Sequence, residues 1–479
     1  MALRSPAEFK EGLKDGRVIY YRGERVEDVV AHEDLGIGVE HVALDYELAE
    51  SPENSDLYVW DDPELKQSCS RYFKIPVSSV DLLNRRRMIE ESTRLADAVV
   101  LLIKEIGSDA IFALDLITNN VDSEYGTEYR SRLKAFHQQC KINDFSLAVA
   151  QTDVKGNRSL LPSDQEHADY YVRIVEERSD GIVVRGAKAH TTCAPYVDRI
   201  IVLPTRAFGE NDGAYAVSFA VPVNAPGIKL IASPFGSPPV SNFHHPISSR
   251  HRMIDTLTIF DDVFIPNENV FLKGEWEYAG PLANTFVEYH RFTAVSYKPP
   301  LCDLFIGAAA LLAHYNGIAK ASHVRDKLTK LITYTETVRG LSLAAAHGCV
   351  EQDTGAVIPN VTQTNLAKYH FANGYHEAVS WVQDIAGGLV VTGPAEEDVF
   401  SPETGPYIER FLGGNKVSAE DRLRALNLVR DLTASAFGGY NELLAIHAEG
   451  SLEAQKITLL RDFDLERCVN LAKRALRSE

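Results

Sequence analysis

Residues 255–274, Asp-Thr-Leu-Thr-Ile-Phe-Asp-Asp-Val-Phe-Ile-Pro-Asn-Glu-Asn-Val-Phe-Leu-Lys-Gly, mark a change in the pattern of the chain. The stretch is typical of a strand that ends in a turn containing Pro266. From Gly280 onward, apolar residues recur at helical spacing, as in Leu301 through Ala313. The stretch therefore predicts the boundary between a β-rich region and a long helical region.

The rest of the chain shows the same two patterns in a definite order. Residues 80–106 are mostly strong helix formers, and Gly107 is placed to end that helix. After Cys140, the β-branched runs 171–177 and 181–186 flank a short polar link, which predicts a hairpin, and the runs 199–203 and 215–221 continue the β pattern. The sequence therefore predicts helical, β and helical regions in that order.

Composition excludes several functional classes. With 479 residues the chain is long enough for two or three domains, and its net charge of −18 argues against nucleic-acid binding and against docking on anionic membranes. The N-terminus lacks the apolar core of a signal peptide, and no apolar run approaches the length of a spanning helix. We expect a soluble, cytoplasmic protein with neither a nucleic-acid nor a membrane partner.

The six cysteines are widely spaced, and none forms a Cys-x-x-Cys pair. This spacing predicts neither a zinc ribbon nor a bacterial ferredoxin-type site. In a reducing cytoplasm, scattered free thiols are the expected state.

A second segment, Gln383-Asp384-Ile385-Ala386-Gly387-Gly388, lies in the C-terminal helical region. As a pattern, Gly-Gly often marks only the end of a helix. Its position nevertheless resembles the flavin-contacting Gln-x-x-Gly-Gly turn of acyl-CoA dehydrogenase-like flavoproteins, and residues 255–274 resemble the passage from their β-domain to their helical bundle. The resemblance implies an α+β fold with an N-terminal α-helical domain (1–140), a middle antiparallel β-barrel domain (141–277) and a C-terminal four-helix bundle (278–479).

Further stretches resemble one branch of these flavoproteins, the family of 4-hydroxyphenylacetate 3-monooxygenase and 4-hydroxybutyryl-CoA dehydratase. Residues 15–17 and 22–28 resemble both enzymes. The stretches closer to the dehydratase, or extending the match, are 42–49, 152–159, 186–190, 215–220, 289–291, 306–310 and 320–324. The resemblance covers nearly the whole chain and implies an FAD enzyme.

The iron–sulfur cluster of the dehydratase has no matching ligand set in this chain. The dehydratase holds its cluster with three cysteines and one histidine. His290 occupies the histidine position, whereas Leu101, Glu105 and Tyr297 occupy the cysteine positions. Because these side chains cannot replace thiolates, we expect no iron–sulfur cluster and no other metal site.

The resemblance also assigns the cofactor-binding residues. They are Gln151, Thr152, Asp153, Arg158, Ser159, His190, Thr191, Gln383, Ala386, Gly387 and Gly388. The alternatives are an ordinary surface turn for the loop at 152–159 and a structural role for His190. In this family the Gln383–Gly388 turn usually reaches the flavin of a neighbouring subunit, which implies a homo-oligomer, either a dimer or a homotetramer.

The candidate catalytic residues are His290, Tyr297 and Lys298. His290 can act as an acid, a base or a hydrogen-bond donor, or it can be a scaffold histidine. Tyr297 either donates its hydroxyl to substrate or fills the volume of the missing cluster. Glu442 and His447 fall near the catalytic glutamate region of the dehydratase.

A run of three arginines, Arg85–Arg87, is predicted to form a solvated helix face. The alternative is a clamp for the phosphates of a CoA thioester.

These features favour a flavin-dependent monooxygenase. Reduced flavin, supplied by a separate flavin reductase, would react with O₂, and the flavin–oxygen adduct would attack the substrate. The resemblance points to an aromatic or cyclic polyene substrate carried as an acyl-CoA, as in tropone-type secondary metabolism. The alternative is a non-oxygenating acyl-CoA dehydratase, isomerase or dehydrogenase, with His290 or Glu442 as the base.

Overall fold

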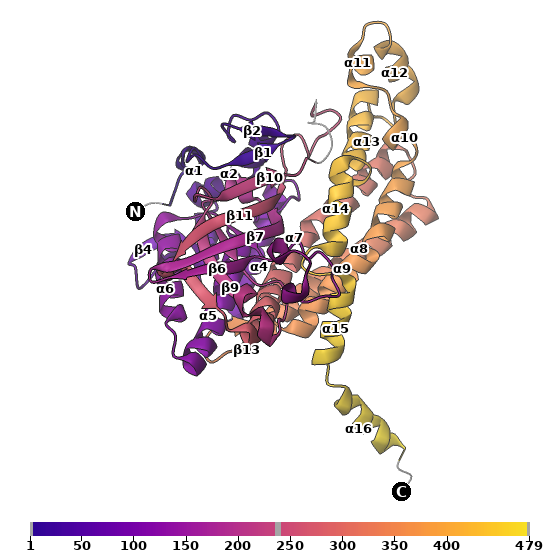
Figure 1. The fold of residues 1–479 in the computed structure, drawn as a ribbon. Coiled ribbons are helices and arrows are strands. Elements are labelled where there is room, and N and C mark those ends of the chain that lie inside the picture. Colours follow the sequence, from indigo (N-terminus) through magenta and orange to yellow (C-terminus); the bar gives the residue numbers. More distant parts are fainter. Residues whose placement is uncertain (1–2, 235–240, 477–479) are drawn as a thin grey trace.

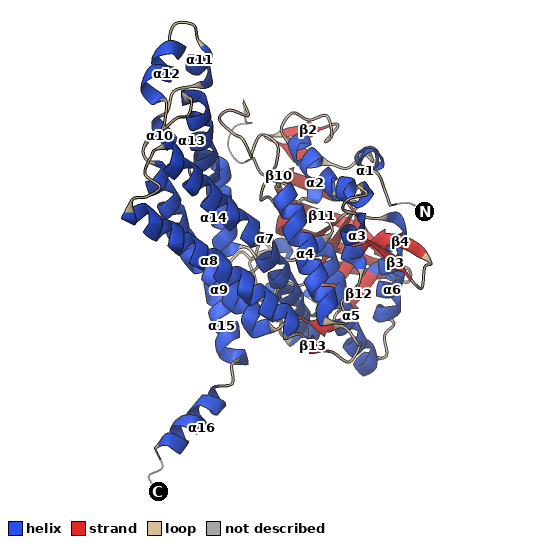
Figure 2. Cartoon of the chain, turned by 180° about the vertical axis from the view of Figure 1, so that it is seen from behind, coloured by secondary structure: helices blue, strands red, loops and turns tan. Residues whose placement is uncertain are grey.

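The computed structural model describes residues 3–234 and 241–476. Figure 1 shows the strands and the N-terminal helices in one body, with the long helices of the C-terminal half beside it and α16 projecting away. Seen from behind, helices α2, α4 and α5 cover the strands (Figure 2). A continuous cluster of buried apolar side chains runs through all three regions.

The N-terminal region is mainly helical, as predicted. Its elements are α1 (Pro6–Gly12), β1 (Ile19–Tyr21), β2 (Glu24–Val26), α2 (Leu35–Glu50), α3 (Ser55–Tyr58), β3 (Val59–Asp62), β4 (Gln67–Ser70), α4 (Ser79–Leu95), α5 (Glu105–Tyr125) and α6 (Tyr129–Asn143).

The middle region holds the predicted strands. They are β5 (Leu147–Ala150), β6 (Arg173–Arg178), β7 (Gly181–Thr192), β8 (Arg199–Val202), β9 (Val217–Pro222), β10 (Ile228–Ala232), β11 (Asp255–Pro266) and β12 (Val270–Lys273). The predicted hairpin is formed by β6 and β7, with Arg178 paired to Gly181. Most residues of β11 alternate between buried and partly exposed, the pattern of a strand with one face in the core.

These strands form two sheets, one of order β2-β1-β10-β11-β7-β6 and one of order β12-β9-β8-β5. Most pairs are antiparallel, as the resemblance implied. However, β1 pairs in parallel with β10, and β5 pairs in parallel with β8. Neither parallel pair is joined by a hairpin, so nothing in the local sequence predicts its direction.

The C-terminal region contains the bundle. Its elements are α7 (Ala279–Tyr315), α8 (Ser322–His347), β13 (Val350–Glu351), β14 (Val357–Ile358), α9 (Val361–Ala386), α10 (Leu389–Thr392), α11 (Glu396–Phe400), α12 (Gly405–Leu412), α13 (Ala419–Thr433), α14 (Ala436–His447), α15 (Leu452–Asp462) and α16 (Leu465–Ala475). Helices α7, α8, α9 and α13 pack together as the four-helix bundle. None of the described helices combines the length and apolarity needed to cross a membrane.

The prediction of one helix over residues 80–106 is wrong. Helix α4 ends at Leu95, α5 begins at Glu105, and Gly107 lies inside α5 instead of ending a helix. A Cβ added at Gly107 would lie 2.2 Å from Cβ of Leu147, so the glycine lets α5 pack closely on β5. Between the two helices, Asp97, Ala98 and Leu102 adopt positive φ angles that no helix accepts.

Candidate active site

A cavity lies between the segment that links α4 to α5 and the C-terminal helices. Its apolar walls come from Val99, Val100, Met253, Leu301, Phe371 and Leu444. The polar side chains at its edge are Tyr297, Lys298 and Asn441. A mostly apolar cavity with a few converging polar groups is the usual form of a small-molecule site. Two of the three predicted catalytic residues therefore line one cavity.

Tyr297 and Lys298 occupy an unusual position in α7. They directly precede Pro299 and Pro300, which lie inside the helix. Because proline has no N–H, the carbonyls of Val295 and Ser296 lose their helical donors, and the helix is weakened at this point.

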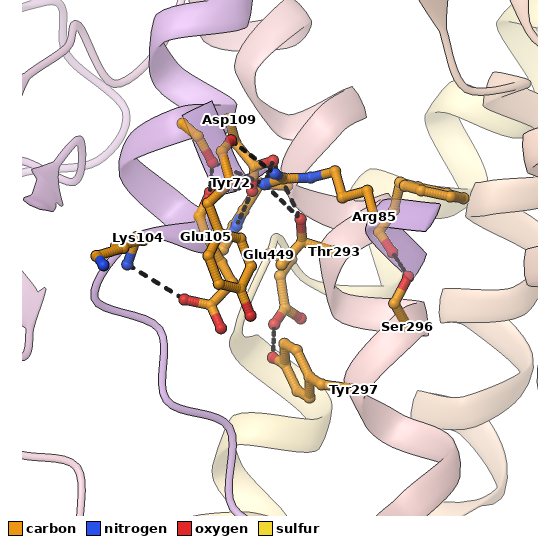
Figure 3. Close-up of polar contacts among 12 residues, drawn as sticks. Tyr72, Arg85, Lys104, Glu105, Asp109, Thr293, Ser296, Tyr297 and Glu449 are labelled. Atoms are coloured by element: carbon orange, nitrogen blue, oxygen red, sulfur yellow. Dashed lines mark hydrogen bonds and ion pairs between the residues drawn. The ribbon is translucent and has the colours of Figure 1, made fainter. Parts of the chain in front are cut away.

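A buried ionic cluster holds Lys298 in place. The Lys298 ammonium nitrogen lies 3.3 Å from Oε2 of Glu449, and that of Lys368 lies 3.1 Å from the same oxygen. The Tyr297 hydroxyl donates a hydrogen bond to Oε1 of Glu449, as Figure 3 shows. Lys298, Lys368 and Glu449 thus form a charged group shielded from solvent.

Burial and neighbouring charges shift the pKa values of Lys298 and Glu449. Burial, together with the nearby Lys368, lowers the pKa of Lys298 to about 7, although Glu449 opposes the shift. Burial alone would raise the pKa of Glu449, but the ammonium groups of Lys298 and Lys368 hold it well below its ordinary value. Lys298 can therefore gain or lose a proton near neutral pH, while Glu449 stays ionised beside it.

Glu449 is a site residue that the sequence analysis missed. It lies between α14 and α15 with φ of +54°, a left-handed conformation that is uncommon outside glycine. Its carbonyl accepts a hydrogen bond of 2.9 Å from Nε of Arg291. Gly450 follows with φ of +95°. The Glu-Gly pair between two helical patterns was the one local signal that could have indicated this turn.

The candidates Glu442 and His447 are corrected by this finding. Glu442 pairs with His376 and is partly exposed, and His447 is exposed at the end of α14. The carboxylate that reaches Tyr297 and Lys298 belongs to Glu449.

A second buried network holds His290 (Figure 3 shows Arg85, Asp109 and Thr293 of this group). Nδ1 of His290 lies 3.2 Å from Oδ2 of Asp109, and Nη2 of Arg85 lies 2.7 Å from Oδ1 of Asp109. Thr293 donates to Oδ1 at 3.0 Å. A carboxylate bound to one imidazole nitrogen fixes the ring orientation and leaves Nε2 as the reactive atom. This arrangement can position His290 as an acid or a base.

The prediction of a solvated face at Arg85–Arg87 is wrong for two of the three residues. Arg85 and Arg86 are buried, and only Arg87 is exposed. Neighbouring residues of a helix point in different directions, and α4 packs against both α7 and α8, so two of the three side chains face protein. Arg86 pairs with Glu90 at 2.7 Å, so neither buried arginine is placed as a phosphate clamp.

Glu105 adds a buried acid near this network (Figure 3). Its side chain is fully buried at the start of α5. Oε2 accepts a hydrogen bond of 3.2 Å from the Lys104 N–H, whereas Oε1 has no hydrogen-bond partner among the residues described. Burial raises the pKa of Glu105 to about 7, and the Asp45 carboxylate acts in the same direction.

Replacing Glu105 with glutamine is expected to stabilise the protein at alkaline pH. The folded state keeps a proton on Glu105 up to pH 7, which the unfolded state releases near pH 4.5. Stability therefore falls as pH rises through this window. Urea unfolding should show E105Q more stable than wild type by about 2–3 kcal/mol at pH 8 and equal to it at about pH 4.

The control for this experiment is Glu91→Gln, since Glu91 is 43% exposed on α4. It should change the free energy of unfolding by less than about 0.5 kcal/mol at either pH. An E105Q variant with wild-type stability at pH 8 would contradict a buried, protonated Glu105.

The structure shows where the four residues lie that were predicted to match the cluster ligands of the dehydratase. Leu101 and Glu105 are buried in the N-terminal region, and His290 and Tyr297 are buried in α7. No group of three or more His, Cys, Asp or Glu side chains in residues 3–234 and 241–476 could hold a metal ion. A leucine, a glutamate and a tyrosine do not fit an iron–sulfur cluster, whose ligands are thiolates.

Two of the predicted cofactor segments, far apart in sequence, lie side by side. The N–H of Ala189 donates to the carbonyl of Thr152 at 2.9 Å, and Asp153 forms a β-bridge with Lys188. The Gln151 side chain donates to the carbonyl of Ala283 at 3.4 Å, which joins this edge to the start of α7. The segments 151–153 and 188–191 thus form one edge that faces the helical bundle.

Individual side chains on this edge differ in what they can offer a cofactor. His190 is exposed, whereas Thr191 is buried and accepts a hydrogen bond from Thr258. Asp153 is buried and pairs with Lys188 at 2.8 Å, so its carboxylate is bonded inside the protein and does not point towards a cofactor at this edge. Arg158 and Ser159 lie on the exposed loop that follows β5.

The Gln383–Gly388 segment lies elsewhere. Helix α9 ends at Ala386, and Gly387, with φ of +84°, is the residue that ends it. Figure 1 shows the end of α9 beside α10, far along the bundle from β7. Gln383 donates to the carbonyl of Thr433 at 3.3 Å, and both glycines are exposed. Within one protomer this segment is therefore not brought to the other cofactor residues.

Comparison with known proteins agrees with this architecture. The models for the N-terminal and C-terminal parts of 4-hydroxyphenylacetate 3-hydroxylase match residues 5–272 and 279–477. The chain is 34% identical over 475 residues to 4-hydroxybutyryl-CoA dehydratase/vinylacetyl-CoA-Delta-isomerase of Clostridium aminobutyricum, covering 95% of each chain. It is 28% identical over 443 residues to the oxygenase component of 4-hydroxyphenylacetate 3-monooxygenase of Thermus thermophilus, covering 92% and 90%.

Solved structures give the same result. An oxygen-tolerant archaeal 4-hydroxybutyryl-CoA dehydratase from N. maritimus superposes with a TM-score of 0.94 at 31% identity, over 100% of this chain and 96% of that one. The oxygenase component of 4-hydroxyphenylacetate 3-monooxygenase complexed with FAD gives a TM-score of 0.90 at 26% identity, over 99% and 98%. The predicted α+β fold and the predicted relationship to both enzymes are confirmed, and the chain belongs to the 4-hydroxyphenylacetate 3-hydroxylase family.

Proposed function

We propose that this protein is a flavin-dependent oxygenase that uses reduced FAD and O₂ to oxidise a phenolic or other unsaturated cyclic substrate. The observation that carries the proposal is the apolar cavity with Lys298 at its edge, an amine of near-neutral pKa beside an ionised Glu449. Relatives named as oxygenase components act on 4-hydroxyphenylacetate and 4-nitrophenol, both phenols.

FAD fits the edge formed by 151–153 and 188–191, where backbone groups and the exposed His190 can hold it near the bundle. When bound in its reduced form, FAD would supply the electrons that activate O₂. The two glycines after α9 would serve the flavin site of a neighbouring subunit, so we propose a homo-oligomer. Because its relatives are named oxygenase components, we also propose a separate reductase.

The side chains around the cavity have definite tasks. Neutral Lys298 accepts the proton of a substrate hydroxyl at its Nζ, and Glu449 stabilises the ammonium group that results. The phenolate is more electron-rich than the phenol and reacts more readily with an electrophilic oxygen. His290, oriented by Asp109, offers Nε2 as a second proton donor or acceptor. The apolar walls exclude water from the reacting groups.

The 34% sequence identity to 4-hydroxybutyryl-CoA dehydratase, whose substrate is a CoA thioester, favours an acyl-CoA substrate whose acyl group carries the ring. The same observation supports the second candidate function, a non-oxygenating dehydratase or isomerase. In that reaction Lys298 and His290 would move protons next to the thioester carbonyl, with Glu449 as the counter-charge of Lys298.

Oxygen-18 labelling separates the two functions. Purified protein is supplied with FAD, NADH, a flavin reductase and ¹⁸O₂, and is offered 4-hydroxyphenylacetate and its CoA thioester. An oxygenase transfers one ¹⁸O atom to the product, as mass spectrometry would detect. The control omits the protein but keeps the reductase. Loss of water from 4-hydroxybutyryl-CoA without O₂, and no labelled product from either aromatic probe, would reject the oxygenase in favour of the second function.

A further inference from the structure

Two buried histidines meet behind the wall of the cavity. His41 belongs to α2, and His251 lies in the loop before β11. Their Nδ1 atoms are 3.1 Å apart. Nε2 of His41 lies 3.0 Å from the carbonyl oxygen of Val100, and Nε2 of His251 lies 3.0 Å from Oδ2 of Asp97. The pair therefore connects α2 to both ends of the segment 97–100.

The hydrogen-bond partners determine where the protons lie. The Val100 carbonyl can only accept, so Nε2 of His41 carries a proton. Burial, with His251 nearby, lowers the pKa of His41 to about 3, so His41 is neutral and its Nδ1 accepts. Nδ1 of His251 must then donate. Nε2 of His251 also donates, because Asp97 is a carboxylate whose pKa is held low by the hydrogen bond from His251. His251 thus carries both protons and is an imidazolium.

The segment that this pair holds is part of the cavity. Ala98, Val99 and Val100 line it on one side, and Met253 lines it two residues after His251. Asp97 and Ala98 have φ angles of +51° and +69°, so the wall adopts a backbone conformation that non-glycine residues avoid. Such a conformation persists only where surrounding contacts hold it, and the histidine pair supplies two of those contacts.

We propose that His251, as an imidazolium, is a positioning residue that holds the wall at 97–100 of this cavity. If the pair loses this third proton, its two remaining N–H groups can make only two of the three bonds to Val100, Asp97 and each other, and the strained wall is released. Among the described residues, the charged and titratable groups bonded to His251 or to its carboxylate partner are His41 from α2, Asp97 from the wall and Arg250 from its own loop. Arg250 pairs with Asp97 at 2.8 Å. The next pair along this loop is Arg252 with Asp34 at the start of α2.

The consequence is a wall that is ordered at lower pH and loosened at higher pH. The effect on substrate rests on the proposed function, because it assumes that the cavity binds the ring. The hold of the histidine pair on the wall at 97–100 does not depend on the proposed function, and it can be measured without any substrate.

Hydrogen–deuterium exchange of the peptide 96–104, measured on the intact protein, tests whether the histidine pair holds the wall. The N–H groups of Ala98 and Val99 are the reporters, since they donate to Thr93 at 2.8 Å and to Ala96 at 3.0 Å. After correction for the intrinsic rate, their exchange should rise about tenfold between pH 6 and 8.5, the effect of one lost hydrogen bond. H251Q should exchange fast at both pH values. D97N, at a partly exposed position, should shift the transition to lower pH, because the imidazolium loses its counter-charge.

The matched comparison is R250Q, which removes the other cation on Asp97 but keeps the histidine pair, so its transition should persist and move to higher pH, opposite to D97N. Equal protection at both pH values in the wild type, or a transition unchanged in D97N, would overturn the proposal. Binding of 4-hydroxyphenylacetate, followed by calorimetry over the same pH range, then asks whether the wall affects the ring. If the exchange rate of the wall changes with pH but 4-hydroxyphenylacetate does not bind, the role of His251 is supported and the proposed substrate class is not.

Discussion

Replacing Lys298 with methionine is expected to lower kcat/KM for a phenolic substrate by about 100- to 10,000-fold, the usual contribution of a general base. Lys298 lines the cavity and, because burial lowers its pKa to about 7, it is partly neutral at physiological pH. Only the neutral amine accepts a proton. Wild-type kcat/KM should therefore rise with pH up to about pH 7 and level off above it, and steady-state kinetics from pH 5.5 to 9 would show this profile.

Two variants make this experiment specific. Lys298→Arg keeps the positive charge but cannot become neutral, so it should be as inactive as Lys298→Met. Lys141→Met removes another buried lysine, which pairs with Asp62 at 2.6 Å and does not line the cavity. It should lower stability but leave kcat/KM of the folded enzyme unchanged. A Lys298→Met enzyme with wild-type kcat/KM would show that Lys298 is not the base.

Replacing Glu449 with glutamine is expected to destabilise the protein by about 3–5 kcal/mol at pH 7, because Lys368 is left buried without its counter-ion and Lys298 loses the carboxylate that favours its charged form. The pKa of Glu449 is lower in the folded than in the unfolded state, so its stabilisation is fully present above about pH 4.5 and is lost as pH falls. Urea unfolding should therefore show a difference between wild type and variant that shrinks as the solution is acidified below that pH.

A double variant tests the cause of this effect. Lys298→Met combined with Glu449→Gln removes one of the two buried amines left without a carboxylate partner and should be more stable than Glu449→Gln alone. Glu442→Gln, at the partly exposed carboxylate near the same C-terminal helix end, should change stability by less than about 0.5 kcal/mol. If Glu442→Gln were the more destabilising of the two single changes, the ionic cluster around Glu449 would not have the role described here.

Local patterns in the sequence were sufficient for the order of the regions. The hairpin of β6 and β7 and the strand β11 depend on runs of a few residues and on the turns that end them, and both were predicted. The family relationship was also predicted, because it rests on short stretches of the chain that resemble the two related enzymes in the same order. The resemblance likewise predicted that Leu101, Glu105 and Tyr297 stand in place of the thiolates of the dehydratase cluster.

The tertiary structure decided which side chains are buried and which distant residues they contact. The burial of Arg85 and Arg86 depends on helices that pack against α4 from more than 200 positions away, as the bonds to Thr293 and Ser342 show. No helix pattern indicates such partners. In the same way, Gly107 looks like a helix end until β5 is seen to pack against it.

The sequence by itself determined the fold class, the family and the candidate residues His290, Tyr297 and Lys298, because each depends on neighbours along the chain. Only the tertiary structure selected Glu449 in place of Glu442, 151 positions from Lys298, and joined His41 to His251 across 210 positions. The physical reason is that a buried charge must find a counter-charge or a hydrogen bond wherever the folded chain provides one. That partner is set by packing and not by spacing in the sequence.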